Sequence, residues 1–557
     1  MSAEPRTPSD IDRVAEEWVD TVVDLHPTIG TYIGRREADR RLPDYSPKGH
    51  ERVVQATRDA LAAIRAIEPV DAVDLVTATD LGSELELALE EDAAQLHLRD
   101  LNVIASPAQD IRDAFDLMAT ETVDDWETIA ARLGEVPRAV DGYVATLRLG
   151  GERGVVPAIR QVREVAAQAR RQARPDGFFV EFAAGATAGD AKLPATLAAD
   201  LERAAAGAAS AYERLADFLE TELAPRAGER DAVGREIYAL RSRHFLGAVV
   251  DLDETYEWGI EELARMVAEQ ESIAREILPG ASVAEAIAHL EADPSRKLHG
   301  TDALQRWMQE TSDRAVAELG ATQFDIPAEI RTLECMIAPT QEGGIYYTGP
   351  TDDFSRPGRM WWSVPEGVTE FDTWRELTTV YHEGVPGHHL QIGQAVVNRA
   401  MLNTWRRQLA GTSGHAEGWA LYAERLMQEL GYLDDPADRL GMLDGQRMRA
   451  ARVVLDIGVH LGKPHPDGHG DWTGDDAFDF LRRNVAMSDE FVRFEVNRYL
   501  GWPGQAPSYK VGQRIWEQLR DETRRREGAA FDIRSFHKRA LDLGGVGLDT
   551  LRTALLG

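Results

Sequence analysis

Residues 198–223, AADLERAAAGAASAYERLADFLETEL, decide the fold class of this 557-residue chain. Their apolar residues recur three and four positions apart between charged ones, which is the period of an amphipathic helix. Residues 80–101 repeat this pattern, and the chain up to about residue 325 is rich in Ala, Arg, Glu and Leu. The sequence therefore predicts a mainly α protein whose first helical subdomain covers residues 1–325.

Between residues 329 and 370 the helical period is lost. The runs IRTLECMIAP, GGIYYTGP and RMWWSVPEG are β-branched or aromatic and contain Gly or Pro breaks, which predicts a few short strands. Helical periodicity resumes at Asp372 and dominates to the C-terminus. We therefore expect a second subdomain over residues 326–557 that contains a small β patch, unless the two parts form one continuous domain.

The charge balance excludes two classes of partner. The chain has 62 basic and 95 acidic residues, a net charge of −33 and a pI near 4.9. A field of that sign repels phosphate backbones and anionic lipid, so we expect neither nucleic-acid nor membrane binding. The sequence shows no basic and then apolar leader and no run of eighteen apolar residues, which predicts a cytoplasmic protein. Its oligomeric state is not indicated.

Residues 381–391, YHEGVPGHHLQ, contain three histidines close to a glutamate. A helical zinc site usually reads His-Glu-x-x-His, in which two imidazoles one turn apart bind one ion and the glutamate activates water. His382 and Glu383 match the first two positions, but Pro386 stands at the second histidine. On an unbroken helix neither later histidine could share an ion with the first, because position i+6 is rotated by about 120° and i+7 lies about 10 Å along the axis.

Pro386 also indicates how a site can form here. Proline disfavours the helical conformation at the residue before it, and the glycine after it tolerates unusual backbone angles. The second ligand of the usual motif lies four residues after the first. If two extra residues bulge out of the helix, His388 comes to that position, whereas His389 would reach it only if three residues bulge out. We therefore predict His382 and His388 as metal ligands and Glu383 as general base. Taken alone, these histidines could equally be ordinary core or surface residues.

A second segment, GHAEGWALYAE at 414–424, contains a candidate third ligand. Zinc hydrolases with a two-histidine helix commonly take a glutamate from a following helix. Glu417 follows His382 by 35 residues, which is enough for a connection and an antiparallel return, and its small neighbours permit close helix packing. We predict Glu417 as the third ligand and His415 as its rival. The alternative is that Glu417 is a solvated residue of the first helical turn.

These motifs resemble the bacterial domain-of-unknown-function 885 family, regarded as gluzincin-like zinc metallopeptidases. The stretches RVVLDIGVH at 452–460 and RYLGWPGQAPSYKVG at 498–512 are similar to later motifs of that family, in the same order. The resemblance covers most of the chain. It implies a mainly α fold with a deep cleft between helical halves, one zinc ion and peptide hydrolysis. It also agrees with His388 as ligand, because the family can carry an aromatic residue at the position of His389.

Other residues are predicted to support this centre. Tyr509 is the candidate donor to the oxyanion, since acyl hydrolysis needs a donor besides the metal. Tyr346 and Tyr347 are candidates for pairing with a substrate backbone, unless they only pack in a hairpin. Candidates for binding a substrate carboxylate are Arg452, Arg498 and Lys510, and candidates for orienting a metal-binding imidazole are Asp456 and His389. Arg452 and Asp456 lie four residues apart and could instead pair with each other.

Together these residues predict a zinc-dependent peptidase that cleaves short peptides, in the manner of a carboxypeptidase or dipeptidase. One alternative is hydrolysis of a non-peptide amide or ester, because the same groups act on any carbonyl. Another is a non-catalytic helical protein with a structural metal. Structural zinc is usually held by four protein ligands, which disfavours that alternative. A Gly-x-Ser-x-Gly sequence is absent, so serine hydrolysis has no support.

Overall fold

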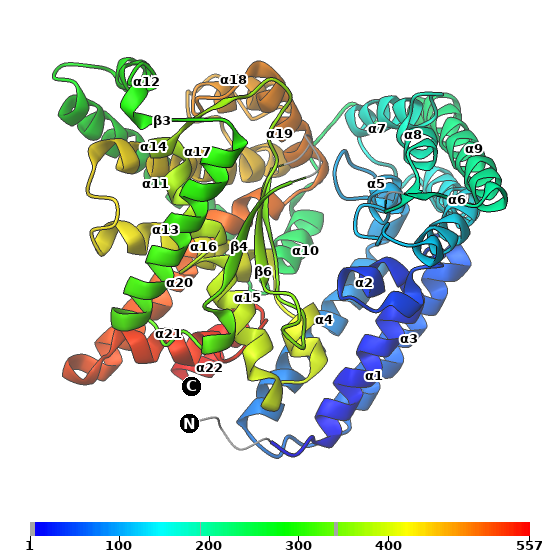
Figure 1. The fold of residues 1–557 in the computed structure, drawn as a ribbon, viewed down its shortest axis with the longest axis horizontal. Coiled ribbons are helices and arrows are strands. Elements are labelled where there is room, and N and C mark those ends of the chain that lie inside the picture. Colours follow the sequence, from blue (N-terminus) through cyan, green and yellow to red (C-terminus); the bar gives the residue numbers. More distant parts are fainter. Residues whose placement is uncertain (1–5, 190, 339–343) are drawn as a thin grey trace.

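The computed structural model describes residues 6–189, 191–338 and 344–557, and it confirms the prediction of a mainly α protein (Figure 1). The first part of the chain contains α1 (Asp10–Leu25), α2 (Pro27–Tyr32), α3 (Pro47–Arg65), α4 (Ala72–Ala93), α5 (Pro107–Asp113), α6 (Val123–Arg153), α7 (Ile159–Gln172), α8 (Phe178–Ala184), β1 (Thr187–Ala188), β2 (Ala191–Lys192) and α9 (Ala195–Phe218).

The second part begins with α10 (Arg235–Leu246), α11 (Leu252–Ile277), α12 (Val283–Glu291), β3 (Lys297–His299) and α13 (Thr301–Thr322). The predicted strand region contains β4 (Leu333–Ile337), β5 (Ile345–Thr348), β6 (Gly358–Trp362) and β7 (Glu370–Asp372). The remaining helices are α14 (Thr373–Glu383), α15 (His388–Val397), α16 (Ser413–Glu429), α17 (Pro436–Leu461), α18 (Asp476–Arg482), α19 (Asp489–Gly501), α20 (Gln505–Glu527), α21 (Ile533–Leu541) and α22 (Leu548–Leu556). None of the described helices combines the length and the apolar character needed to span a membrane.

The helices of the first part pack around their own core. On α6, Leu133, Val140 and Leu147 recur every seven residues and are fully buried, together with Leu201 and Leu215 of α9. This spacing returns apolar side chains to one helix face, so the two long helices bury a continuous stripe between them. The apolar period seen in the sequence therefore sets this packing directly.

The core of the second part extends from Tyr238 to Leu551, so α10 to α13 pack with the C-terminal helices. Helix α16 crosses α20 very closely, because a Cβ atom on Gly418 would lie only 2.4 Å from the backbone carbon of Gly512. Glycine at the crossing thus permits backbone contact between the two helices. The division of the chain at residue 325 stays a prediction, and this packing groups α10 to α13 with the helices that follow.

The predicted β patch is confirmed as a small sheet with strand order β4–β6–β5. Strand β4 runs parallel to β6, and β5 runs antiparallel to β6 with Tyr346 opposite Trp361. Leu304 and Met308 of α13 and Val380 of α14 share a buried cluster with the sheet. In the described sheet β5 has a strand neighbour on one side only. It contacts α14, which ends with the predicted ligand His382 and the predicted base Glu383.

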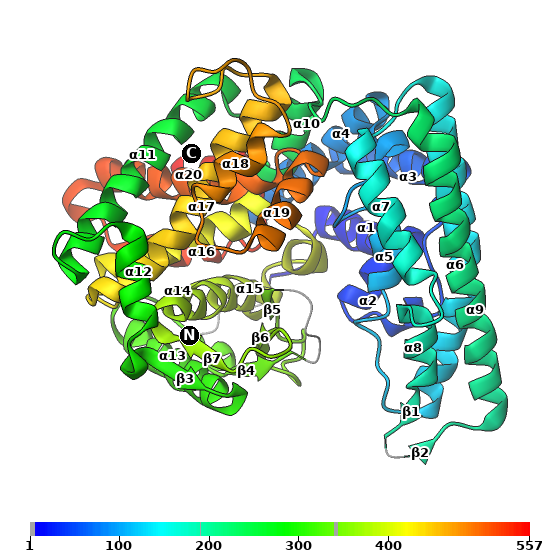
Figure 2. The same cartoon turned by 90° about the horizontal axis from the view of Figure 1, so that it is seen from above.

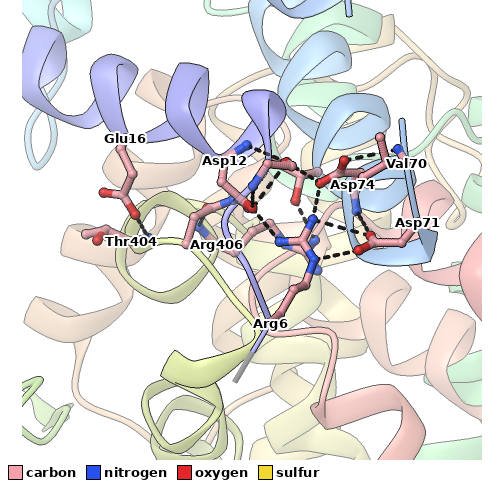
Figure 3. A network of polar contacts seen from close by, with 11 residues as sticks. Arg6, Asp12, Glu16, Val70, Asp71, Asp74, Thr404 and Arg406 are labelled. Atoms are coloured by element: carbon pink, nitrogen blue, oxygen red, sulfur yellow. Dashed lines mark hydrogen bonds and ion pairs between the residues drawn. The ribbon is translucent and has the colours of Figure 1, made fainter. Parts of the chain in front are cut away.

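Figure 2 shows helices α1 to α9 on one side of the molecule and the β patch with α14 to α17 on the other. The two sides are joined by direct contacts: the amide of Asn403 donates to Asp12 at 3.0 Å, and the backbone N–H of Thr404 donates to Glu16 at 2.7 Å. Arg6 also lies at this junction: its guanidinium binds the carboxylates of Asp12, Asp71 and Asp74 within the first part (Figure 3), and its backbone N–H donates to the carbonyl of Ala400 at 3.0 Å.

A cavity of about 310 Å³ lies at another point of the junction between the two sides. Its wall combines residues 96–110 from the first part with residues 233–245 and 500–503 from the second. The two helical halves are therefore in contact but leave a hollow between them.

Candidate metal centre

Helix α14 ends at Glu383 and α15 begins at His388, so the predicted irregularity takes the form of a complete helix break. The break requires glycine at 387, because a Cβ atom there would lie 1.8 Å from the carbonyl oxygen of His382. Trp419 of α16 supports the break from the other side by donating from its indole nitrogen to the carbonyl of Pro386 at 2.8 Å. Across the break, the backbone N–H of Gly387 donates to the carbonyl of Tyr381 at 3.0 Å and that of His389 to the carbonyl of Gly384 at 3.2 Å. The segment between the helices is therefore a bulge, and the rings of His382 and His388 on either side of it have their centroids 4.9 Å apart.

The structure brings His382, His388 and Glu417 together. Their candidate ligand atoms all lie within 4.8 Å of one another. The Oε2 atom of Glu417 is 3.3 Å from Nε2 of His382 and 3.7 Å from Nε2 of His388. That oxygen is buried and has no hydrogen-bond partner among the described residues. Two imidazole nitrogens and one carboxylate oxygen form the donor set of many catalytic zinc sites, so these residues fit a divalent ion.

Ring geometry distinguishes this centre from two other groups of metal-binding side chains. Those groups are His50, Asp92 and His97, and His465, Asp467 and His469. In both, the two imidazoles stack, with centroids 3.5 Å and 4.0 Å apart. Stacked rings hold their in-plane lone pairs side by side, whereas the rings of His382 and His388 are perpendicular, at 90°. Both of the latter direct Nε2 toward one carboxylate oxygen, which favours this centre.

Glu424, which the sequence interpretation missed, holds His382 from behind. Its Oε1 lies 2.7 Å from Nδ1 of His382, and its Oε2 accepts a hydrogen bond from the amide of Gln446 at 3.0 Å. Burial opposes a charge on Glu424, but the hydrogen bond with His382 and the charge of that ring lower its pKa. A carboxylate on the far nitrogen fixes the orientation of a metal-binding imidazole. The sequence contained an indication of this role, because Glu424 follows the predicted ligand Glu417 by seven residues and therefore lies on the same face of α16.

Asp456, in contrast, does not reach a metal-site imidazole, which corrects its predicted role. It accepts hydrogen bonds from the hydroxyl of Tyr238 at 2.7 Å and from the backbone N–H of Gly504 at 3.0 Å. Asp456 therefore ties α17 to α10 and to the start of α20. The alternative pairing with Arg452 is not formed either, because Arg452 binds Glu495.

His389 also has a different role from the one predicted. Its Nε2 donates to the carbonyl of Ile330 at 2.8 Å, and its Nδ1 accepts from the hydroxyl of Tyr347 at 2.9 Å. Burial lowers the pKa of His389 to about 4, so the ring is neutral and suited to one donated and one accepted bond. His389 thus anchors strand β5 to α15, while His388 faces the centre.

Lys510 cannot bind a substrate carboxylate, because it is only 1% exposed and its ammonium group is fully engaged. It donates to Gln446 at 2.7 Å and to Gln513 at 3.0 Å, and it pairs with Glu262 at 3.0 Å. Gln446 in turn donates to the carboxylate behind His382. Lys510 is therefore the far end of a buried polar chain that begins at the metal centre.

Arg452 and Arg498 both pair with the same carboxylate. Glu495 binds Arg452 at 2.7 Å and Arg498 at 3.0 Å, and Arg498 also donates to Gln505 at 2.9 Å. The guanidinium carbon of Arg452 lies 5.2 Å from the centre of the Tyr509 ring. The two arginines thus share one carboxylate near Tyr509, and both have terminal nitrogens engaged by groups of the protein.

Tyr509 is the fifth residue of α20, which begins at Gln505. Burial, and then the negative charge of Glu417, raise the pKa of Tyr509. Its hydroxyl therefore stays protonated and can donate a hydrogen bond beside the centre. Glu383 is 6% exposed, and burial raises its pKa while the positive charges of His388 and His382 oppose that rise. A carboxylate with a raised pKa accepts a proton more readily near neutral pH.

Comparison with known proteins identifies the family of this chain. The family described as "Bacterial protein of unknown function (DUF885)" matches residues 27–555, and the chain therefore belongs to it. None of the curated proteins compared with the chain matches it. The family description assigns no activity, so the metallopeptidase character implied by the motifs is not established by membership.

Solved structures show the same fold. A candidate lipoprotein from Colwellia psychrerythraea is 21% identical with a TM-score of 0.83, and the match covers 98% of this chain and 99% of that one. A candidate lipoprotein of unknown function from Shewanella oneidensis is 17% identical with a TM-score of 0.75, covering 99% and 100%. A carboxypeptidase from Pyrococcus furiosus is 13% identical over 99% and 96%, and its TM-score of 0.38 is too low to support an argument.

The prediction of a cytoplasmic protein is wrong in the light of these matches. Both proteins that share the fold over their full lengths are described as candidate lipoproteins. The prediction rested on the lack of a recognisable leader in the sequence, and an absence of that kind does not determine where a protein is located.

Proposed function

We propose that this member of the DUF885 family is a metal-dependent hydrolase of short peptides, with zinc as its ion. The observation that carries the proposal is the convergence of His382, His388 and Glu417 next to the carboxylate of Glu383. A structural zinc site would be expected to supply a fourth protein ligand. Three ligands beside a buried acid are instead the arrangement of a catalytic site with an open position.

The residues around the centre have separate tasks in this proposal. A divalent ion held by the three ligands would polarise a carbonyl group and lower the pKa of a water molecule. Glu383 takes the proton from the attacking water and returns it to the leaving nitrogen, for which its raised pKa is suited. Glu424 holds His382 with Nε2 toward the centre, at 2.7 Å from Nδ1. Tyr509 donates its hydroxyl proton to the oxygen that becomes negative.

Strand β5 is the proposed support for the substrate backbone. It is an edge of the described sheet, and an extended peptide can add to such an edge through main-chain hydrogen bonds. Tyr346 is 41% exposed on this strand, whereas Tyr347 is held by His389. Burial raises the pKa of Tyr347, the charge of Arg356 opposes this rise, and the nearby Glu383 adds to it. Tyr346 is therefore placed to contact a substrate side chain, and Tyr347 to position the strand beside Glu383.

The test compares the wild-type chain with Glu383→Gln. Both proteins are loaded with zinc, their metal content is measured, and both digest the same library of short peptides. Gln keeps the shape of the side chain but cannot accept the proton, so kcat should fall by about 10²- to 10⁴-fold with zinc content unchanged. Glu429→Gln, an exposed carboxylate on α16, is the control and should keep full activity. Full kcat in the Glu383 variant would show that another group is the base.

A further inference from the structure

Arg449 on α17 has no charged partner among the described residues. No described carboxylate lies within 4.0 Å of its guanidinium nitrogens, and its buried Nε makes no hydrogen bond. A buried, unpaired polar nitrogen is costly, and native proteins usually retain one only where another molecule completes the contact. The arginine is partly exposed, so such a molecule can reach it from solvent.

Its position on α17 places Arg449 next to the metal centre. Gln446, Arg449 and Arg452 follow one another at three-residue spacing, so that Arg449 lies on the helix surface between the other two, about 60° from each. Gln446 donates to the carboxylate behind His382, and Arg452 lies over the ring of Tyr509. Arg449 is therefore located between the ligand histidine at one end and the proposed oxyanion donor at the other.

The electrostatics agree with this location. Burial raises the pKa of Glu383, and the charge of Arg449 is one of those that oppose the rise, after His388 and His382. Burial likewise raises the pKa of Tyr509, and Arg449 again opposes it. The positive charge of Arg449 thus acts on the proposed base and on the proposed oxyanion donor.

Other arginines on and near this helix differ from Arg449 in having partners for their terminal nitrogens, although the Nε of Arg439 and that of Arg498 are also buried without a hydrogen bond. Arg452 and Arg498 bind Glu495, and Arg447 donates to Gln270 at 3.0 Å and to Asn484 at 3.0 Å. Arg449 is one residue from the buried Met448 and three from Arg452, yet it forms no such contact among the described groups. A guanidinium left unpaired beside a hydrolytic centre is suited to the planar, bidentate recognition of a carboxylate.

We propose that Arg449 binds a carboxylate of the substrate, so that the preferred substrates are short peptides or acylated amino acids with a free carboxylate close to the cleaved bond. This inference rests on the proposed function and adds the substrate class to it. The competing explanation is that Arg449 only neutralises Glu383 and Glu424. The two explanations differ in one measurable respect: neutralisation of the centre affects every substrate, whereas carboxylate recognition affects acids and not amides.

The experiment measures binding and hydrolysis of paired peptides. Each pair is a tripeptide or tetrapeptide of alanine and phenylalanine, prepared with a free C-terminal carboxylate and as the carboxamide. Binding is measured by calorimetry to the zinc-loaded Glu383→Gln protein, in which turnover should be about 10²- to 10⁴-fold slower than in the wild type. With Arg449 present, the acid should bind about 10- to 100-fold more tightly than the amide, the range of one charge-assisted contact. In Arg449→Met this preference should fall to within about threefold, with zinc content and amide binding unchanged.

Two further variants keep the test decisive. Arg447→Met changes an arginine on the same helix that faces Gln270 and Asn484, and it should keep the full preference for acids. Arg449→Lys retains the charge without the bidentate fork, so it should keep part of the preference and serves if the Met variant does not fold.

Equal binding of acid and amide by the protein that retains Arg449 overturns the inference. An equal loss of both peptides in Arg449→Met also overturns it, and in either case peptide hydrolysis by the wild type leaves the proposed function intact. If the wild type neither binds nor hydrolyses any of the peptides, the proposed function fails and this inference fails with it.

Discussion

Replacing Glu424 by glutamine tests whether the carboxylate behind His382 tunes the metal centre. Glu424 is 2% exposed, its Oε1 is 2.7 Å from Nδ1 of His382, and its Oε2 accepts from Gln446 at 3.0 Å. The bond to His382 is therefore charge-assisted and shielded from water. Glutamine can still accept a hydrogen bond from the ring, but it has no charge, and its amide group would then face the amide of Gln446.

The magnitude follows from the kind of bond that is lost. A hydrogen bond to a charged group contributes about 1.5–3 kcal/mol, and a neutral one about 0.5–1.5 kcal/mol. The difference of about 1–2 kcal/mol corresponds to roughly 5- to 30-fold in zinc affinity, at about 1.4 kcal/mol per tenfold. Variants of such carboxylates in other metal sites typically lose about 10- to 100-fold, which agrees with this estimate.

The assay is competition for zinc against a chelator of known affinity. Glu424→Gln should bind zinc in the same stoichiometry as the wild type but about 5- to 30-fold more weakly. Glu429→Gln on the same helix is exposed and should match the wild type. A zinc affinity within twofold of the wild type in Glu424→Gln would refute the reasoning, provided that His388→Ala loses zinc in the same assay. An equal loss in Glu429→Gln would attribute the effect to net charge and not to orientation.

The remaining predictions concern the helix break and the oxyanion donor. His388→Ala should lose bound zinc. His389→Ala should retain zinc but have a lower melting temperature, because His389 joins Ile330 to Tyr347. If metal analysis shows zinc lost in His389→Ala and kept in His388→Ala, His389 is the ligand and the prediction is wrong. Gly387→Ala should abolish zinc binding or folding, since its Cβ would lie 1.8 Å from a backbone oxygen, and a normally folded, zinc-loaded variant would contradict the geometry of the break. Tyr509→Phe should bind zinc normally and lose about 10²- to 10³-fold in kcat; steady-state kinetics with unchanged kcat would exclude the hydroxyl as donor.

Much of the fold was predictable from local pattern. The apolar period of residues 198–223 is realised in α9, and the β-branched and aromatic runs between residues 329 and 370 form β4, β5 and β6. Helix α1 starts where Ser9 indicates, because the capping side chain and its backbone partner lie three residues apart. Such features depend on neighbours in the sequence, and the chain can satisfy them without reference to distant contacts.

The three proposed ligands were also accessible from the sequence, because proline and glycine restrict the backbone in known ways. Pro386 could not continue the helix, and the residues after it had to change direction. What the pattern could not show is how far the chain would turn. In the structure the helix ends at Glu383 and the next begins at His388, and Trp419 from another helix donates to the carbonyl of Pro386 within the break.

The roles of the surrounding charged residues were decided only by the tertiary structure. Lys510, Arg452 and Arg498 look alike in the sequence as candidates for binding a substrate, yet buried carboxylates engage all three. Glu262 of α11 binds Lys510, and Glu495 of α19 binds both Arg452 of α17 and Arg498 of its own helix. Arg449 was not singled out, although no described carboxylate lies within 4.0 Å of its guanidinium nitrogens and its buried Nε makes no hydrogen bond. The local sequence gives the charge of a side chain and the face of the helix on which it lies. Whether that charge is neutralised depends on which distant carboxylate the packing of the helices brings within about 4 Å, and no pattern along one chain contains that distance.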